Sequence, residues 1–250
     1  MTKSLLLTLT ACLFAAQALA ESMQGRLEWT RRVELATTVN GVVAEVTARV
    51  GQFVPKGEVL AQLETEEYEA RALAAQAGVE RAEAAFEEAQ REWERAEELY
   101  ERTVLSDHEL REARIAFAAA RADRDQALAE RMEAEVELRR TRIIAPFDAL
   151  VLAVSAVPGQ VTINRLRPQG LVTVADGRRM AARLTVAADR LGALAVGKKV
   201  PVTVAGRTYQ GAITEVGLEP VEPGRYPVVV AFEFGRAVLR AGELAEIELP

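Results

Sequence analysis

The sequence predicts an α+β protein of elongated shape, in which a long antiparallel α-helical coiled-coil hairpin splits a small β-sandwich and a small antiparallel β-barrel domain follows. Residues 64–142 contain no proline and one glycine, and they are dominated by Ala, Glu and Arg, which favour helix. Stretches rich in Val and Ile, broken by Gly and Pro, lie on both sides, at residues 39–63 and 143–178. Alternating apolar and polar residues follow in residues 179–250, which is typical of an antiparallel β domain.

Residues 1–20 predict a secretory signal peptide. A lysine precedes an apolar run from Leu5 to Ala16, and Ala18-Leu19-Ala20 supplies a small-residue cleavage site. A lipid anchor at Cys12 is the alternative, but the apolar segment continues beyond that cysteine. An uncleaved anchor is disfavoured because the run is short for a bilayer. We therefore expect export to the periplasm, with residues 21–38 as an N-terminal segment.

The composition excludes several classes of function. A net charge of −6, without blocks of Lys and Arg, gives no support to nucleic-acid binding. Cys12 is the only cysteine and His108 the only histidine, so thiolate catalysis, disulfides and cysteine metal sites are excluded once the signal is removed. The sequence has no glycine-rich phosphate loop. We expect neither an enzyme nor a bound cofactor or metal.

The helical segment shows the seven-residue spacing of a coiled coil with large residues at one seam position and small residues at the other. The large series is Val79, Phe86, Trp93 and Tyr100, and the small series is Ala82, Ala89, Ala96 and Thr103. The second arm continues this seam spacing through Leu110, Ala113, Phe117, Ala120, Ala127, Ala134 and Leu138. Arg124 and Arg131 interrupt this arm, and we expect them to be solvated or paired with Glu of the opposite arm.

A short break divides the two arms. Ser106 followed by Glu109 forms a capping box, so a new helix is predicted to start at Asp107. The preceding helix is predicted to end near Thr103 or Val104. Each arm then has roughly 35–40 residues, or about 50–60 Å, and the short connection makes the arms antiparallel.

The two β-rich halves resemble the halves of a lipoyl or biotinyl carrier domain. Residues 42–63, VVAEVTARVGQFVPKGEVLAQL, carry the first half, and residues 142–163, RIIAPFDALVLAVSAVPGQVTI, carry the second. Val154, Val157, Gly159 and Val161 echo Val46, Val50, Gly51 and Val54 in kind, though not residue for residue. No lysine lies between Lys56 and Lys198, so the turn between the halves has nothing to lipoylate or biotinylate. The fold is therefore expected to serve as a scaffold.

The arrangement resembles the periplasmic adaptor subunits, or membrane fusion proteins of the HlyD-like family, that belong to tripartite efflux pumps of Gram-negative bacteria. The matching blocks are Gly41-Val42-Val43 with Gly51, Val54, Gly57 and Leu60, then the hairpin, then Ile144-Ala145-Pro146-Phe147-Asp148. The family usually has Gly after that Asp, where this chain has Ala149.

The resemblance implies a non-enzymatic adaptor that links an inner-membrane transporter, of the resistance-nodulation-division (RND) class, to a TolC-like outer-membrane channel. It also implies self-association into a ring at the inner-membrane face. An ATP-driven (ABC-type) exporter is the alternative motor, and a periplasmic coiled-coil protein without a transport role is the alternative class.

Residues 179–250 are similar to the β-barrel domain of the same family. Asp189 is predicted to cap a short helical turn before Leu194 and Gly197. The family's membrane-proximal domain is expected to be largely absent, because residues 21–38 could supply only a strand or two of it. A second, longer adaptor could then work alongside this one.

The resemblance also implies a contact site for the channel at the hairpin tip. Arg95, Leu99 and Ser106 fit the family's spacing of an arginine, a leucine four residues later and a serine eleven residues after the arginine. Arg95 and Leu99 are one helical turn apart and share a face. Ser106 is also explained as a helix cap worth about 1 kcal/mol, which is the alternative reading of that residue.

Overall fold

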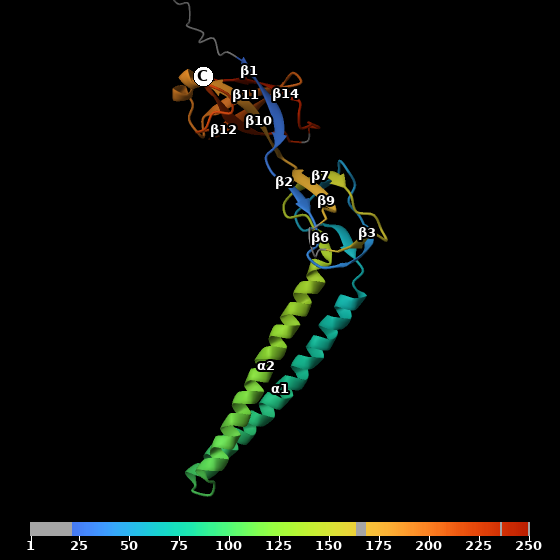
Figure 1. Ribbon diagram of the computed structural model, residues 1–250, viewed down its shortest axis with the longest axis vertical. Coiled ribbons are helices and arrows are strands. Elements are labelled where there is room, and N and C mark those ends of the chain that lie inside the picture. The colour runs from blue at the N-terminus through green and yellow to red at the C-terminus, as the bar shows by residue number, and fades with distance from the viewer. Residues whose placement is uncertain (1–21, 164–168, 236, 250) are drawn as a thin grey trace, which may run out of the picture. The chain divides into compact units, whose positions relative to one another are not determined.

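The computed structural model describes residues 22–163, 169–235 and 237–249 (Figure 1). The predicted signal peptide and Cys12 lie outside the described residues. The chain divides into two compact units: Val33–Val174 forms one, and the residues up to Arg32 and from Ala175 onward form the other.

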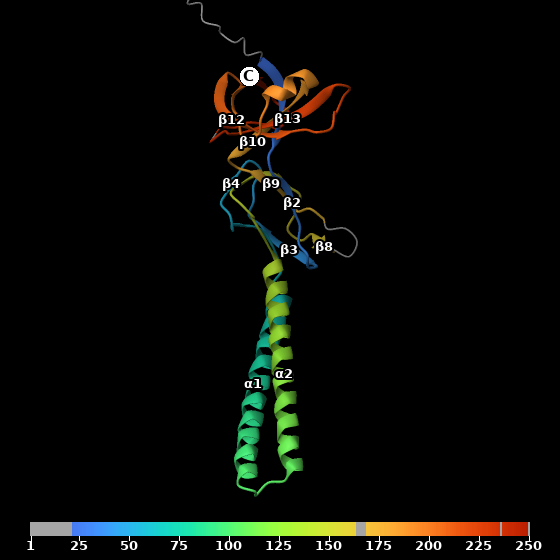
Figure 2. The same ribbon diagram turned by 90° about the vertical axis from the view of Figure 1, so that its left-hand side faces the viewer.

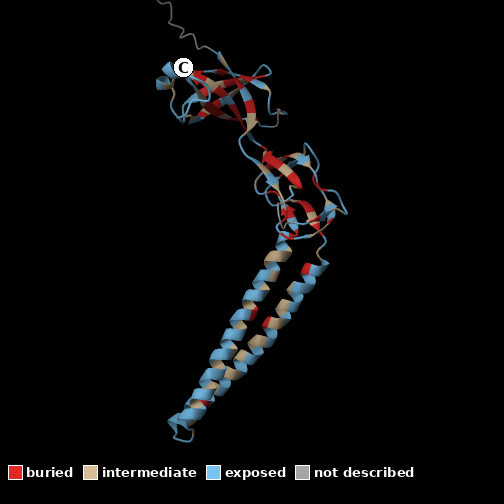
Figure 3. Ribbon diagram, in the orientation of Figure 1, coloured by how far each residue is buried: buried red, intermediate tan, exposed pale blue. Residues whose placement is uncertain are grey.

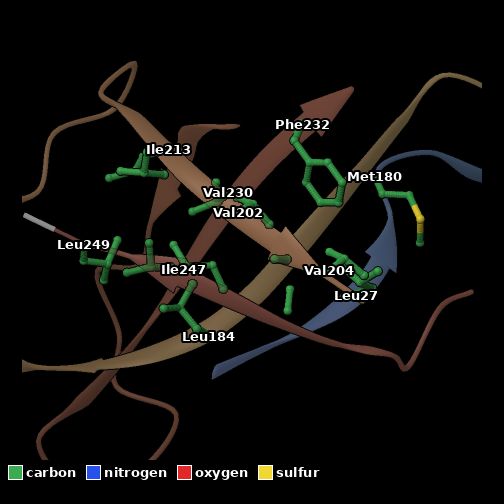
Figure 4. Packing of buried hydrophobic residues seen from close by; sticks show 14 of the residues in the cluster. Leu27, Met180, Leu184, Val202, Val204, Ile213, Val230, Phe232, Ile247 and Leu249 are labelled. Atoms are coloured by element: carbon green, nitrogen blue, oxygen red, sulfur yellow. The ribbon is translucent and has the colours of Figure 1, made fainter. Parts of the chain in front are cut away.

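The second of these units is a closed, antiparallel six-stranded barrel. Its strands follow the order β1-β10-β13-β12-β11-β14 around the barrel. Their bounds are Ser22–Trp29 (β1), Arg179–Ala187 (β10), Arg225–Glu233 (β13), Arg207–Val216 (β12), Lys199–Val204 (β11) and Leu244–Glu248 (β14). Every second residue of these strands points inward, and residues such as Leu27, Val202 and Phe232 fill the interior (Figure 4).

The N-terminal segment contributes strands to both units, β1 to the barrel and Arg32–Leu35 (β2) to the sandwich. Strand β1 lies between β10 and β14, with Leu27 opposite Ala182 and Gly25 opposite Ala245. A Cβ at Gly25 would lie 2.7 Å from the Cδ1 atom of Ile247, so a larger residue here would displace that buried side chain. The strand closes the barrel and leaves no edge with unpaired backbone groups.

The short helical turn in the barrel has a different start from the one predicted. It is a 3₁₀ helix, η1, at Ala188–Ala193, and the residue before it is Ala187. No side chain caps this helix, and Asp189 lies within its first turn. The predicted Asp189 cap is therefore wrong, because β10 continues through Ala187 and moves the helix start one residue earlier.

Tyr209 of β12 carries a buried hydroxyl that has no hydrogen-bond partner among the described residues. Its ring packs against Phe232, with centroids 5.3 Å apart. A buried hydroxyl without a partner costs about 1–3 kcal/mol. We therefore expect Tyr209→Phe to raise the free energy of unfolding of the barrel by about 1 kcal/mol in urea denaturation. Tyr209→Leu, which removes the ring as well, should lower it.

The other unit contains a sandwich of two four-stranded sheets. The first sheet has the order β2-β9-β7-β4 and the second has the order β6-β5-β3-β8. In the first sheet the bounds are Arg32–Leu35 (β2), Val172–Asp176 (β9), Ala149–Val154 (β7) and Phe53–Val54 (β4). In the second they are Arg142–Ile144 (β6), Val59–Leu63 (β5), Gly41–Val46 (β3) and Val161–Thr162 (β8). The core between them includes Leu60, Val151 and Leu171.

Each half of the sandwich contains the same turn, with the same backbone conformation and matching hydrogen bonds. Gly51 and Gly159 both have φ of +84°, a conformation that favours glycine. The N–H of Gly51 donates to the carbonyl oxygen of Val151, and the N–H of Gly159 donates to that of Val43, each over 2.8 Å. Each half thus hydrogen-bonds its turn to a strand of the other half.

A glutamine after each glycine completes the repeat. The Gln52 side chain accepts a hydrogen bond from the Arg49 N–H over 3.1 Å, and the Gln160 side chain accepts one from the Val157 N–H over 3.0 Å. The halves therefore correspond residue for residue in these turns. In this correspondence Val157 is the counterpart of Arg49, whereas the comparison by residue kind had set Val157 beside Val50.

The hairpin joins β5 to β6 and consists of helices α1 (Glu66–Glu101) and α2 (Asp107–Arg140), which lie side by side and antiparallel (Figure 2). Most residues of the two helices are exposed to solvent (Figure 3), as expected for a two-helix coiled coil. The predicted seam residues of α1 are buried or half-buried up to Ala96, whereas Tyr100 and Thr103 are exposed. The predicted seam is thus wrong in its last turn, because Tyr100 lies next to the end of α1 at Glu101 and Thr103 lies beyond it.

Arg124 and Arg131 occupy seam positions of α2. The Arg124 guanidinium lies 4.1 Å from the Phe86 ring centroid on the opposite helix and pairs with the adjacent Asp125. Arg131 reaches Gln76 of α1 over 3.4 Å and pairs with Glu135 of its own helix. The expectation of Glu partners on the opposite arm is therefore wrong for both.

The base of the hairpin is attached to the sandwich through Tyr68. Its hydroxyl donates to the carbonyl oxygen of Asn40 over 2.6 Å. Its ring packs with Val39, Val43 and Leu63. Burial is the main cause that raises the pKa of Tyr68, so the hydroxyl keeps its proton at neutral pH.

Candidate functional site: the hairpin tip

Helix α1 ends in a Schellman motif without glycine. The N–H of Val104 donates to the carbonyl oxygen of Leu99 over 3.0 Å, and the N–H of Thr103 donates to that of Tyr100 over 2.9 Å. This is the double bond pattern that closes many helix C-termini. The residue that takes the left-handed conformation is Thr103, with φ of +59°. A β-branched residue is strained there.

Relief of this strain gives a test of the tip geometry. We expect Thr103→Gly to raise the free energy of unfolding of the hairpin by about 1 kcal/mol, since glycine has no Cβ to clash in the left-handed region. The helical circular dichroism signal during urea denaturation measures this. Thr103→Ala keeps a Cβ and should give less than half of the gain; an equal gain would contradict the strain.

Helix α2 begins with the predicted capping box. The Ser106 hydroxyl accepts the N–H of Glu109 over 3.3 Å and donates to the Glu109 carboxylate over 2.7 Å. The Ser106 N–H donates to the same carboxylate over 2.9 Å. The Asp107 carboxylate at the start of α2 raises the pKa of the Tyr100 hydroxyl at the end of α1. The Schellman motif of α1 and the capping box of α2 thus fix the two ends of the tip loop.

The capping box makes the tip sensitive to acid. The hydrogen bonds from the Ser106 N–H and hydroxyl lower the pKa of Glu109 below its ordinary value of 4.5. Because the folded pKa is lowered, the stabilisation is complete above pH 4.5 and is lost as the pH falls through the lowered pKa. We expect an NMR titration of the Glu109 carboxyl carbon to have its midpoint below 4.5.

Glu109→Gln provides the control for this titration. Glutamine can still accept the Ser106 N–H in a capping box but has no carboxyl to titrate. The acid-induced shift of the Ser106 amide signal should therefore disappear in this variant. A midpoint at or above 4.5 in the native chain would contradict the assignment.

The structure places the three predicted contact residues at the tip, in different roles. Arg95 and Leu99 lie on one flank of the last turns of α1, where Arg95 pairs with Glu92 over 2.7 Å and Leu99 is half-buried. Ser106 is exposed at the start of α2, and its hydroxyl donates a hydrogen bond to the Glu109 carboxylate. Among the described residues, no hydrogen bond or ion pair joins Ser106 to Arg95 or Leu99. The capping box alone accounts for Ser106.

A groove on the opposite flank of the tip was not predicted. Its volume is about 600 Å³, and it lies between α1 and α2. We call it the tip groove; its lining includes Trp93, Glu97, Arg111, Arg114, Phe117 and Arg121. The rings of Trp93 and Phe117 stack at its floor with centroids 4.8 Å apart. The spacing of the arginines, at i, i+3 and i+10, was the sequence signal that could have shown this flank.

The described part of the chain holds no group of three or more His, Cys, Asp or Glu residues arranged for a metal ion. Within the same residues, neither α1 nor α2 is long and apolar enough to cross a membrane as a helix. The tip presents exposed side chains on a turn that is capped at both helix ends.

Comparisons with known proteins give a family and a fold. A family model described as the CzcB-like, barrel-sandwich hybrid domain matches residues 31–176. The macrolide export protein MacA of Escherichia coli O157:H7 is 26% identical over 211 residues, which cover 77% of this chain and 56% of that protein. The chain thus spans about half the length of the curated relatives it matches.

Two solved structures resemble nearly the whole chain. The membrane fusion protein Spr0693 of Streptococcus pneumoniae R6 has a TM-score of 0.70 at 18% identity, covering 92% of this chain and 98% of that chain. A MacA–MexA chimera that contains the α-hairpin domain of Pseudomonas aeruginosa MexA has a TM-score of 0.70 at 24% identity, covering 92% and 81%. At these identities the likeness is one of fold.

Proposed function

We propose, from the premise that this chain belongs to the family with a CzcB-like barrel-sandwich hybrid domain, that it is an adaptor subunit of an efflux pump. In this role it links an inner-membrane transporter to a TolC-like outer-membrane channel. It acts through contacts between proteins and not through catalysis. The relatives named as an export protein and a membrane fusion protein support this reading.

The hairpin is the observation that carries the proposal. A carrier domain presents a lysine on the turn between its halves, whereas here α1 and α2 fill that position between β5 and β6. The capped tip is a rigid surface about 50 Å from the base, at 1.5 Å per residue of helix. Arg95 and Leu99 on its flank offer a charged group and an apolar contact to the channel.

The remaining partners follow from the resemblance of the sequence. We propose an RND-type transporter as the motor, with an ATP-driven exporter as the alternative. Several copies would surround the conduit in a ring in the periplasm, and a second adaptor could share the contact with the transporter.

Deletion and capture together test the proposal. Cells that lack the gene should accumulate an exported dye or drug, and the native chain should restore its export. A tagged chain purified from cross-linked membranes should carry a transporter, whose class decides between the two motors. Unchanged export together with capture of no membrane protein would favour the periplasmic structural protein instead.

A further inference from the structure

Two arginines border the aromatic floor of the tip groove. Phe117 of α2 stacks on Trp93 of α1, with centroids 4.8 Å apart and an angle of 18° between the ring planes. Arg114 and Arg121 lie three residues before and four residues after Phe117, so both share the face of α2 that carries this ring. Both rings line the groove and are half-buried. The groove thus offers an aromatic surface between two guanidinium groups.

Further packing holds this floor in place. Phe117 also lies against Phe86, with centroids 5.4 Å apart. The Arg124 guanidinium lies 4.1 Å from the centroid of the Phe86 ring. The rings are therefore positioned before a ligand arrives, which lowers the entropic cost of binding.

Arg114 and Arg121 have no acidic partner among the described residues, and the sequence explains why. An arginine on a helix surface usually pairs with a carboxylate three or four residues away. Arg114 has no acidic residue at any of these positions. Arg121 has Asp125, but the Asp125 carboxylate pairs with Arg124 over 2.8 Å. Both guanidinium groups are therefore available to an anion from outside the hairpin.

The groove carries an excess of positive charge. Its lining includes the three arginines Arg111, Arg114 and Arg121 and one carboxylate, Glu97. Arg111 donates to the backbone oxygen of Asp107 over 3.0 Å, and Glu97 has no ion pair in the described part of the chain. Because Glu97 on α1 repels an anion, the favourable position for one is on the α2 side, beside Arg114 and Arg121.

We propose that the tip groove binds a small aromatic anion, a compact molecule of fused or linked rings that carries a sulfonate, carboxylate or phosphate group. The volume of about 600 Å³ lies within the range of small-molecule sites. The rings of the ligand stack on the floor of Trp93 and Phe117. Its acidic group accepts charge-assisted hydrogen bonds from Arg114 and Arg121. The proposal does not depend on the transport role.

Anilinonaphthalene sulfonate (ANS) is a probe of this class, and Trp93 reports its binding directly. The chain has two tryptophans, Trp29 in the barrel and Trp93 in the groove. Trp29→Phe keeps a ring beside Phe234 and leaves Trp93 as the only tryptophan. In this variant we expect excitation of Trp93 to produce ANS emission by energy transfer, which saturates as ANS is added. The absence of such transfer up to millimolar ANS would overturn the proposal.

N-phenylnaphthylamine is the neutral control ligand, because it has the same rings as ANS without the sulfonate. It should bind about tenfold more weakly than ANS, since it gains nothing from the guanidinium groups. Energy transfer from Trp93 measures both affinities. Equal affinities would overturn the proposal, because the groove would then be only an apolar surface of the kind that another helix covers.

Neutral substitutions in the Trp29→Phe chain test the charges. Arg114→Gln and Arg121→Gln should each weaken ANS binding about threefold, the usual size for an exposed ion pair. The double variant should bind ANS and N-phenylnaphthylamine alike. Glu97→Gln should strengthen ANS binding, because it removes a repulsive charge. Helical circular dichroism verifies that each variant is folded.

Arg95→Gln is the matched control variant. Arg95 does not belong to the lining of the groove and pairs with Glu92, so its substitution should leave ANS binding unchanged. A double variant of Arg114 and Arg121 that binds ANS as tightly as the Arg95→Gln chain would overturn the proposal. Weaker binding in Glu97→Gln would overturn it as well.

Discussion

Leu60→Ala is expected to lower the free energy of unfolding of the sandwich by about 2–5 kcal/mol, the usual cost of a leucine-sized cavity in a core. Leu60 is 0% exposed and lies in the core between the two sheets. A loss of this size is a large share of the roughly 5–15 kcal/mol that stabilises a typical domain. Urea denaturation followed by a signal from the sandwich measures it.

The repeat within the sandwich supplies a matched pair for this test. The Leu60 carbonyl accepts the N–H groups of Thr47 and Ala48, and the Leu171 carbonyl accepts those of Ser155 and Ala156. Leu171 is also 0% exposed, so Leu171→Ala should cost a similar amount. Leu73→Ala, at a leucine that is 72% exposed, should change stability by less than about 0.5 kcal/mol. Equal effects at Leu73 and Leu60 would contradict the described core.

Leu99→Asp is expected to abolish export to the level of a deletion strain. The substitution places a charge at the centre of the proposed channel contact, where loss of a hot-spot residue costs at least about 2 kcal/mol, or roughly thirtyfold in affinity. The measurement is the minimal inhibitory concentration of an exported compound in cells that carry the variant.

Two controls distinguish loss of the proposed channel contact from loss of helix stability. Leu73→Asp makes the same change on the same helix far from the tip and should leave export intact. Ser106→Ala removes the cap and should lower helix stability by about 1 kcal/mol while export persists. Loss of export in Leu73→Asp would show that α1 does not tolerate the charge, and the contact at Leu99 would lose its support.

Features set by neighbouring residues were predictable from the sequence. The fold class is confirmed, with a split sandwich, a helical hairpin and a barrel, and so is the resemblance to the adaptor family. The capping box at Ser106 is confirmed because it needs only Glu109, three residues away. The end of α1 was harder to place: a Schellman motif is usually marked by glycine, and here Thr103 takes that position.

Features that depend on distant pairing were not predictable. Strand β1 pairs with β10 and β14, far along the chain, and nothing local to its sequence shows this. The seam positions of Arg124 and Arg131 also depend on what the other helix offers, the Phe86 ring and the Gln76 amide. The tip groove exists only once both helices are in register.

Site-specific photocrosslinking from position 99 in intact cells, with identification of the captured protein, tests the central claim most directly. The adaptor role predicts capture of an outer-membrane channel from position 99. Capture of sibling copies alone from position 99, with the channel present in the cell, would contradict the channel contact.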